Sequence, residues 1–380
     1  MRVLLVTDTF NYGGAERHTA DLALALKGRG FAVRVACVKL HMALFKEPAY
    51  APLLESVLNL GGQRFIDLQA IRSLRNLIAE FEPDVILSSN LFALMYASIA
   101  RAGRPLVGVF HTTVQRSRKE ELKLRFLYRM FVNRTSAFVF LCHFQADYWR
   151  SRGLKPSFSQ VIYNGIDLGR FHPGVVVEHR LAARVSMGVG PDDLVVGCNA
   201  MLRPEKNHRQ LLHALAALRH QGRPFVAALL GDGPERDGLE ALAVELGIAK
   251  HVRFLGRQSR VEIFLAAFDI GVLPSISTET FSLAALEQMA LGIPMVMSDQ
   301  GGAREMLKDG EHGFVVPTGD LQALISALDR MRDGPLRAKL GAAAADNVVQ
   351  RFDSTIMVDQ YVELLRRIVG VDMCSEAPVL

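Results

Sequence analysis

Residues 194–218 read LVVGCNAMLRPEKNHRQLLHALAAL, and this stretch decides the fold. The valine-rich apolar run predicts a buried strand, the polar loop MLRPEKNH follows it, and apolar residues then recur at helical spacing. The same order of strand, loop and helix recurs along the whole chain, which is typical of parallel sheets with helices on both faces. We therefore predict an α/β protein.

The predicted strands form two series. The first comprises VLLVTD, VRVACV, DVILSS, PLVGVF, AFVFLC and SQVIYN, and the second comprises LVVGCNA, PFVAALLGDG, VRFLG, DIGVLP, IPMVM and GFVVP. At 380 residues the chain also exceeds the size at which one core keeps growing. We predict two doubly wound, Rossmann-like domains over residues 1–170 and 191–352, a glycine-rich linker over 171–190, and an amphipathic terminal helix over about 353–370.

Composition excludes several classes of protein. No run approaches the roughly 20 apolar residues that span a bilayer. The N-terminal sequence MRVLLVTDTF is too short and too polar for a signal peptide, and it predicts a buried strand. The cysteines lack the spacing of a metal site or of a disulfide framework, so we expect a reducing, cytoplasmic compartment. They are Cys37, Cys142, Cys198 and Cys374.

Two glutamates bracket the start of a helix predicted over residues 281–292, with Glu279 before it and Glu287 inside it. If both were helical, about 12 Å of axial rise would separate them. The carboxylate pair of a glycosidase is only roughly 5 to 9.5 Å apart, so these two cannot share one bond as acid and base. Their spacing suits a ligand with a sugar at one end and a ribose at the other. Alternatively, Glu279 complements the helix dipole and Glu287 is a solvated helix residue.

Groups near these glutamates could hold a diphosphate. The backbone N–H groups of Phe281, Ser282 and Leu283 would point at it from the start of the helix. Arg203 and Lys206 lie in the loop after a strand and beside another helix N-terminus, where they form a possible clamp. Taken alone, such a pair is more often ordinary surface charge.

The first half of the chain carries two smaller signals. In NYGGAERH, Gly13 and Gly14 sit where a helix begins, so their N–H groups could meet a phosphate or a sugar while Glu16 and Arg17 face a cleft. A simple strand-to-helix turn explains these glycines equally well, and the GxGxxG fingerprint is absent here. His111 directly follows PLVGVF, where an imidazole could bind a sugar hydroxyl or stabilise departing charge. A lone histidine is more often structural.

Positive charge is concentrated in one part of the chain. The net charge is +5, yet twelve basic and only three acidic residues lie between Arg101 and Lys155. Within it, residues 115–134, from Gln115 to Arg134, predict a basic amphipathic helix that either lies on anionic lipid or covers a sheet with its charges solvated. Nucleic acid is a weaker alternative, because no RNA- or DNA-binding motif is present. The apolar residues of this helix are Leu122, Phe126, Leu127, Met130 and Phe131.

The ordered set of GGAERH, His111, NGID, RPEKNH, GDGP, E-x7-E followed by MALGIP, and GG-x-x-E resembles glycosyltransferase family 4 over nearly the whole chain. The resemblance implies a GT-B fold, in which two Rossmann-like domains flank an interdomain cleft and the terminal helix packs back on the first domain. It implies a retaining hexosyltransferase that needs neither a cofactor nor a metal. A UDP- or GDP-sugar would be the donor, and a saccharide or lipid-linked molecule of polysaccharide or lipopolysaccharide biosynthesis would be the acceptor.

Carried over by position, the resemblance assigns donor contacts to the second domain. Arg203 and Lys206 would hold the diphosphate and neutralise the leaving group. Glu287 would bind ribose hydroxyls, and Glu279 would contact the transferred sugar. Backbone contacts would come from Phe281, Ser282 and Leu283. Thr280 and Ser282 replace glycines that are frequent in the family, so the donor sugar stays open.

In the first domain, Gly14 would approach the donor phosphate and His111 would sit beside the reacting sugar. Gly13, Glu16 and Arg17 would lie on the acceptor side. Two alternatives remain at this point. One is another GT-B enzyme, such as a nucleotide-sugar epimerase or a phosphorylase, and the other is a non-catalytic peripheral membrane protein that binds sugar nucleotides.

Overall fold

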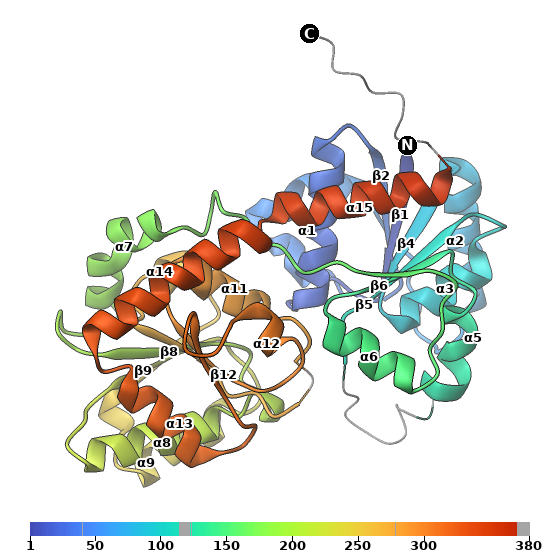
Figure 1. Cartoon of the computed structure of the whole chain (residues 1–380). Coiled ribbons are helices and arrows are strands. Elements are labelled where there is room, and N and C mark those ends of the chain that lie inside the picture. The colour runs from blue at the N-terminus through green and yellow to red at the C-terminus, as the bar shows by residue number, and fades with distance from the viewer. Residues whose placement is uncertain (40, 114–121, 123, 278, 371–380) are drawn as a thin grey trace. The chain divides into compact units, whose positions relative to one another are not determined.

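The computed structural model describes residues 1–39, 41–113, 122, 124–277 and 279–370 (Figure 1). Its contacts divide the chain into two units. Unit 1 contains Met1–Tyr163 and the chain from Thr355 onward, and unit 2 is Asn164–Ser354. Each unit is a parallel sheet with flanking helices, so the predicted pair of doubly wound, Rossmann-like units is confirmed. The change of unit after Tyr163 comes earlier in the chain than the predicted end of the first domain at residue 170.

The sheet of unit 1 has the order β3-β2-β1-β4-β5-β6-β7, with parallel pairs throughout. Its strands are β1 (Arg2–Thr7), β2 (Ala32–Cys37), β3 (Val57–Asn59), β4 (Val85–Ser89), β5 (Leu106–Phe110), β6 (Ala137–Phe140) and β7 (Ser159–Val161). Strand β1 is central, and Leu5 lies opposite Val35 of β2 on one side and Leu87 of β4 on the other. Because helices cover both faces, these strands are nearly continuous apolar runs.

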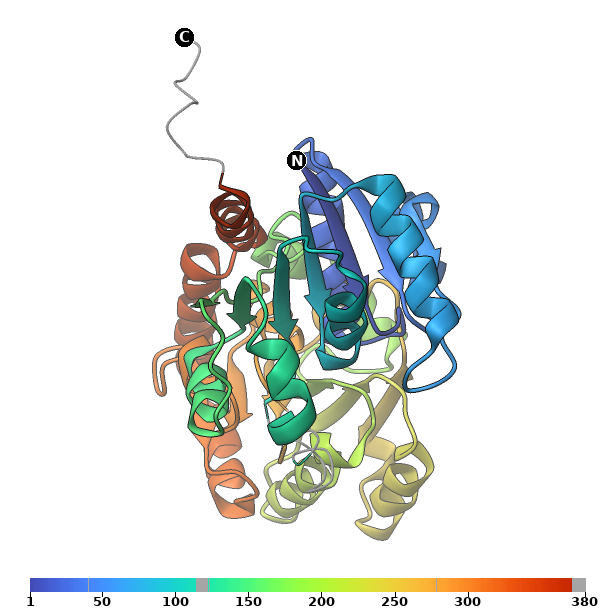
Figure 2. The ribbon, with the colours of Figure 1, turned by 90° about the vertical axis from the view of Figure 1, so that its right-hand side faces the viewer.

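Helices cover the sheet of unit 1 (Figures 1 and 2). They are α1 (Gly14–Gly28), α2 (Leu68–Phe81), α3 (Leu91–Ala100), α5 (Arg129–Val132), α6 (His143–Ser151) and α15 (Ser354–Val369), with 3-10 turns at Ala43–Lys46 and Pro48–Ser56. Asp67 starts α2 as its N-cap, because its carboxylate accepts from the N–H groups of Gln69 and Ala70. Strand β3 was not predicted, since it is a short strand at the edge of the sheet and carries no alternating pattern.

Helix α15 presents an apolar face to unit 1 and crosses α1 (Figure 1). Its Asp359 forms an ion pair with Arg29, which follows the end of α1. Its buried residues follow the helical spacing of the sequence, and they are Met357, Val358, Tyr361, Leu364 and Leu365. In the part of the chain that the structure describes, no helix is both long and apolar enough to cross a bilayer.

The sheet of unit 2 has the order β10-β9-β8-β11-β12-β13 and is likewise parallel. The strands are β8 (Val195–Asn199), β9 (Val226–Leu230), β10 (Val252–Gly256), β11 (Ile270–Leu273), β12 (Met295–Ser298) and β13 (Gly313–Val316), and each matches a predicted strand. The helices are α7 (Pro173–Ser186), α8 (His208–His220), α9 (Arg236–Glu245), α10 (Val261–Leu265), α11 (Leu283–Ala290), α12 (Ala303–Met306), α13 (Leu321–Arg330) and α14 (Gly334–Arg351).

The linker predicted over residues 171–190 is wrong, because most of it forms helix α7 of unit 2. Pro173 takes the first helical position, where its missing N–H costs nothing. Gly188, with φ 61°, follows the C-terminus of the helix. The glycines and proline therefore mark the ends of a helix and do not mark a flexible connection.

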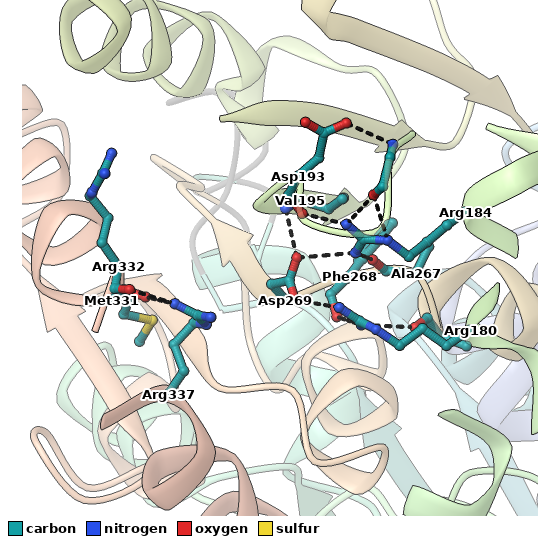
Figure 3. Close-up of polar contacts among 12 residues, drawn as sticks. Arg180, Arg184, Asp193, Val195, Ala267, Phe268, Asp269, Met331, Arg332 and Arg337 are labelled. Atoms are coloured by element: carbon teal, nitrogen blue, oxygen red, sulfur yellow. Dashed lines mark hydrogen bonds and ion pairs between the residues drawn. The ribbon is translucent and has the colours of Figure 1, made fainter. Parts of the chain in front are cut away.

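Two arginines of α7 hold the helix on unit 2 (Figure 3). The guanidinium of Arg180 donates to Asp269 at 2.6 Å, and the buried Arg184 donates to the same carboxylate at 3.3 Å. Arg184 also donates to the carbonyls of Gly190 and Ala267. The charge of Asp269 therefore compensates two cations at the surface where α7 packs.

Candidate functional site

The sheet of unit 2 changes direction between β8 and β11. From β8 the chain continues to β9 on one side, and β11 lies on the other side of β8. Loops diverge at such a switch point and leave a crevice outside the carboxyl ends of the strands. The loop after β8 carries Arg203 and Lys206, and the loop after β11 carries Glu279. A backbone hydrogen bond of 2.9 Å from Ile276 to Glu205 joins the two loops.

Lys206 and Glu279 meet at this switch point. The Lys206 ammonium lies 2.5 Å from Oε2 of Glu279, and the Ser275 hydroxyl donates to the same oxygen at 3.1 Å. Their side chains are only 22% and 12% exposed, so Lys206 is not ordinary surface charge. Arg203 is half-buried, and its side chain forms no ion pair with any residue that the structure describes. One cation of the predicted clamp is thus neutralised within the protein and the other is not.

The segment around Glu279 is fixed by the glycines of QGGARE. The N–H of Gly302 donates to the carbonyl of Thr280 at 2.7 Å. Gly301 has φ 56°, and a Cβ there would lie 2.3 Å from the carbonyl oxygen of Glu279. The protein's own backbone therefore fills the space beside Gly301. The glycines act on the site by positioning Glu279.

Helix α11 begins at Leu283, two residues later than predicted. The hydroxyl of Ser282 accepts from the N–H of Ala285 at 3.3 Å, and serine is a better N-cap than phenylalanine. Phe281 therefore lies before the cap, and its carbonyl accepts from the Asn164 side chain at 2.8 Å. Of the three predicted N–H donors, Ser282 and Leu283 belong to the helix start and Phe281 does not.

Glu287 is fully buried on α11, so its reading as a solvated helix residue is wrong. Its Oε2 accepts from the side-chain amide of Asn199 at 2.9 Å. Asn199 is the last residue of β8, so the Glu287 carboxylate lies next to the carboxyl end of that strand, at the same switch point. Sequence reasoning missed Asn199, although a polar residue that ends an apolar strand was a usable signal.

His208, the first residue of α8, was also missed. It is buried, and neither ring nitrogen has a hydrogen-bond partner among the residues that the structure describes. Burial, and secondarily the charge of Lys206, lower the pKa of His208 to about 4. The imidazole is therefore neutral at pH 7 and adds no positive charge beside Lys206.

Unit 1 has its own switch point between β1 and β4. Asp8 follows β1, and its carboxylate accepts from the N–H of Ala93 in α3 at 2.6 Å. The pKa of Asp8 is raised to about 7, mainly by burial and also by Glu16, while the hydrogen bond from Ala93 and the charge of Lys39 oppose the shift. Sequence reasoning missed Asp8 as a candidate, although an acidic residue directly after a buried strand was visible.

The glycines of NYGGAERH have different surroundings. Gly13 is the N-cap of α1, and a Cβ there would lie 2.3 Å from the Glu16 carboxylate, which folds back over it. Nothing lies within 4 Å of a Cβ built at Gly14, so only Gly14 borders open space. Glu16 accepts from the Thr9 hydroxyl at 2.9 Å. Arg17 forms a hydrogen bond with the phenol of Tyr50.

His111 lies directly after β5 on a rigid support. Gln145 of α6 donates from its side-chain amide to the carbonyls of Phe110 and Thr112, at 2.8 and 3.1 Å. Trp149 donates from its indole N–H to the same Thr112 carbonyl at 3.1 Å. Burial lowers the pKa of His111 well below its usual value, and the neighbouring His18 lowers it further. The structure therefore presents a neutral imidazole on a fixed loop.

Only part of the basic segment can be compared with its prediction. Residues 114–121 and 123, which include Gln115, lie outside the described residues. The remainder is a π-helical turn over Leu124–Tyr128 followed by α5, so it is not one regular α-helix. The apolar residues divide between two faces. Phe131 is buried and Leu127 packs against the core, whereas Leu122, Phe126 and Met130 are exposed.

The cysteines and the possible metal ligands can be examined over the described residues. Cys37, Cys142 and Cys198 are buried free thiols, and Cys374 lies outside the described part of the chain. Over the same described residues, no group of three or more His, Cys, Asp or Glu side chains could hold a metal ion.

Parts of this chain are similar in sequence to curated glycosyltransferases. The D-inositol 3-phosphate glycosyltransferase of Saccharomonospora viridis is 37% identical over 224 residues, which are 56% of this chain and 50% of the relative. The lipopolysaccharide core biosynthesis glycosyltransferase LpsE of Rhizobium meliloti is 38% identical over 138 residues, 36% of this chain and 40% of the relative. The chain thus spans half or less of the length of these curated relatives.

A solved structure matches far more of the chain. HepE of Anabaena in complex with UDP-glucose is 26% identical, with a TM-score of 0.82, and the match covers 97% of this chain and all of HepE. The family profile described as Glycosyl transferases group 1 matches residues 182–347. The profile described as Glycosyltransferase Family 4 matches residues 12–170. The two Rossmann-like units are those of GT-B glycosyltransferases, and the chain belongs to glycosyltransferase family 4.

Proposed function

We propose that the protein transfers a sugar from a UDP- or GDP-sugar to a saccharide or lipid-linked acceptor in the biosynthesis of a cell-surface glycan such as lipopolysaccharide. The observation that carries this proposal is the pair of Lys206 and Glu279, joined across the switch point of unit 2. HepE, which is similar over nearly the whole chain, has been solved with UDP, with UDP and glucose, and with UDP-glucose. These complexes favour a uridine donor.

The cations of unit 2 suit a leaving diphosphate. When the bond between the sugar and the diphosphate breaks, negative charge develops on the phosphate oxygen. Arg203 has no internal counter-ion among the described residues, and a guanidinium binds phosphate oxygens through two parallel hydrogen bonds. Lys206 shares its charge with Glu279, so binding of a diphosphate would draw the ammonium toward the phosphate. The Glu279 carboxylate would then accept from a sugar hydroxyl.

The nucleoside end of the donor would lie toward Glu287. A carboxylate accepts two hydroxyl protons of a ribose, and Asn199 holds the Glu287 carboxylate from one side. Glu287 has no exposed surface in the structure, so a ribose must displace neighbouring side chains to reach it. The N–H groups at Ser282 and Leu283, at the positive end of α11, would face the phosphates.

We place the reaction in the retaining, metal-independent class. The acceptor oxygen would attack the anomeric carbon from the face that the phosphate leaves, and its proton would pass to the leaving phosphate oxygen. Arg203 and Lys206 would supply the positive charge that a metal ion supplies in other transferases. His111, as a neutral imidazole, can donate one hydrogen bond and accept another beside the reacting sugar. Acceptor groups would be bound in unit 1 near Gly13, Glu16 and Arg17.

A thermal-shift screen of UDP-, GDP- and ADP-sugars tests the donor class. Only a donor with the right nucleotide stabilises the protein by mass action, and the shift grows with ligand concentration. Transfer from that donor to lipid-linked saccharides, in buffer with a metal chelator, then tests both the reaction and the metal requirement. Anomeric NMR signals of the product report retention or inversion. Binding without transfer to any acceptor would favour a non-catalytic protein.

We also propose a peripheral contact with anionic membrane at the cytoplasmic face. Leu122, Phe126 and Met130 are exposed next to the exposed Arg129, in the region where basic residues outnumber acidic ones. Apolar side chains that enter a lipid interface beside cations are typical of interfacial segments. The alternative that this segment only covers a sheet accounts for Leu127 and Phe131, but it leaves the exposed residues unexplained.

A further inference from the structure

Three aromatic side chains from distant segments meet in unit 1. His18 lies on α1, His111 follows β5, and Tyr361 lies on α15. The rings of His18 and His111 are 4.8 Å apart between centroids, with their planes at 67°. The phenol oxygen of Tyr361 lies 3.3 Å from Nε2 of His18, and the two ring centroids are 5.6 Å apart. The result is a row in which His18 contacts both other rings.

His18 and Tyr361 are polar residues at core positions, and their burial has a cost in free energy. His18 and Tyr361 are both fully buried or nearly so, at 2% and 0% exposed. A polar group that leaves water without a full set of hydrogen bonds destabilises the fold, and Nδ1 of His18 has no partner among the described residues. An aliphatic residue would fill this space without that cost. The hydrogen-bonding capacity of the pair is therefore what distinguishes it from ordinary packing.

Both supporting groups are uncharged at neutral pH. Burial lowers the pKa of His18 to about 4 and raises the pKa of the Tyr361 phenol. The neutral phenol of Tyr361 and the neutral imidazole of His18 can form one hydrogen bond. This bond determines which edge of His18 faces His111. A neutral His18 also keeps positive charge away from His111, whose own pKa is lowered mainly by burial.

The backbone around His111 is held by α6. Gln145 and Trp149 bind the backbone carbonyls on either side of His111, which fixes the point from which its side chain projects. The ring of His18 lies against the ring of His111 and restricts its rotation. We propose that His18 and Tyr361 are positioning residues that hold the imidazole of His111 in one orientation. The proposal rests on the proposed role of His111 beside the reacting sugar.

This arrangement makes the C-terminal helix part of the catalytic support. Tyr361 comes from α15, and α15 is anchored on α1 by the ion pair of Asp359 with Arg29. His18 belongs to the same helix α1. The orientation of His111 therefore depends on how α15 docks on unit 1, although α15 does not itself carry a predicted site residue.

Tyr361→Phe tests the proposal because it removes one hydroxyl and keeps the ring. We expect kcat to fall roughly 10-fold, since small misplacement of a catalytic group is expensive in rate. The affinity for the nucleotide should stay unchanged, because Tyr361 does not touch Gly14 and the other proposed donor contacts lie in unit 2. His18→Phe should give the same split between kcat and affinity. In ¹H–¹⁵N spectra, the ring signals of His111 should shift from their wild-type positions in either variant, because the orientation of its ring changes.

Tyr96→Phe is the matched control. Tyr96 is also fully buried in unit 1, and its hydroxyl makes two hydrogen bonds, from Asp67 N–H and to the Arg64 carbonyl. It should lose stability without changing kcat or the His111 signals. The proposal is overturned if Tyr361→Phe leaves kcat and the His111 spectrum as in the wild type, or if Tyr96→Phe lowers kcat equally. If His111→Ala keeps wild-type turnover, the catalytic role of His111 fails, while the His111 signals of Tyr361→Phe still decide the positioning.

Discussion

At the scale of single residues, the proposed donor site depends on Lys206, whose positive charge is already paired with a carboxylate of the protein. Lys206 binds Glu279, and a donor diphosphate in the proposed site would compete for the same ammonium. Such an arrangement keeps two charges compensated when no ligand is bound, because an isolated buried charge is unfavourable. It also makes the site respond to the charge of the ligand, since each phosphate oxygen replaces a carboxylate oxygen of the protein.

Lys206→Ala should weaken the binding of the donor nucleotide about 10- to 100-fold. A hydrogen bond to a charged group contributes about 1.5 to 3 kcal/mol, and the variant also leaves the Glu279 carboxylate facing the phosphates. Calorimetric titration with UDP and GDP measures the change. Lys250→Ala is the control, because Lys250 is an exposed lysine of the same unit. Equal affinities in Lys206→Ala and the wild type would refute the donor-site assignment.

At the scale of elements, α7 shows how strongly one buried cluster can hold a helix. Asp269 accepts from Arg180, Arg184 and the N–H of Val195, so it is the common acceptor of the cluster (Figure 3). Asp269→Ala leaves the buried guanidinium of Arg184 without its counter-ion. We expect unit 2 to lose about 3 to 5 kcal/mol of its free energy of unfolding, as for other broken buried ion pairs.

The control for this variant is Asp329→Ala. Asp329 pairs with Arg223 in the same unit, but their side chains are 33% and 44% exposed. Exposed ion pairs contribute at most about 1 kcal/mol, so this variant should unfold almost as the wild type does. Urea unfolding, followed by a probe in unit 2, compares the two. A loss in Asp269→Ala no larger than in Asp329→Ala would show that the cluster does not hold α7.

The strands could be predicted because their signal is local. The valine-rich run of β8 is buried on both faces. Its apolar composition predicts this burial even when the partner strands are unknown. The errors arose where local signals compete. The proline and glycines around α7 resemble a linker, and the start of α11 depends on one serine hydroxyl.

The candidate site divides in the same way. Arg203, Lys206 and Glu279 lie in loops directly after strands, so their positions follow from the alternation of strand and helix. Contacts between distant segments have no local signal. Asn199 could be connected with Glu287, or His18 with Tyr361, only after the fold had placed segments 88 and 343 residues apart side by side.

At the scale of the whole molecule, two of the exposed apolar rows among the described residues differ in the charge around them. Leu122, Phe126 and Met130 of unit 1 are 60%, 71% and 44% exposed and lie among basic residues. A comparable row on α7 of unit 2 lies beside arginines that Asp269 already compensates. Its members are Val177, Leu181 and Val185, at 87%, 72% and 71% exposed. The exposed fractions alone would favour the row on α7 as a lipid contact. Exposure combined with positive charge favours the row in unit 1.

Replacing Leu122, Phe126 and Met130 together by serine should therefore reduce binding to vesicles that contain anionic lipid by more than about 10-fold, because each side chain would otherwise bury apolar area in the interface. Serine at Val177, Leu181 and Val185 should change binding little. Raising the salt concentration should weaken the wild type, since screening removes the attraction of the basic residues for the lipid headgroups. Vesicle co-sedimentation at low and high salt measures both effects. If the two triple variants bind equally, or if salt has no effect, the membrane contact does not lie in this part of unit 1.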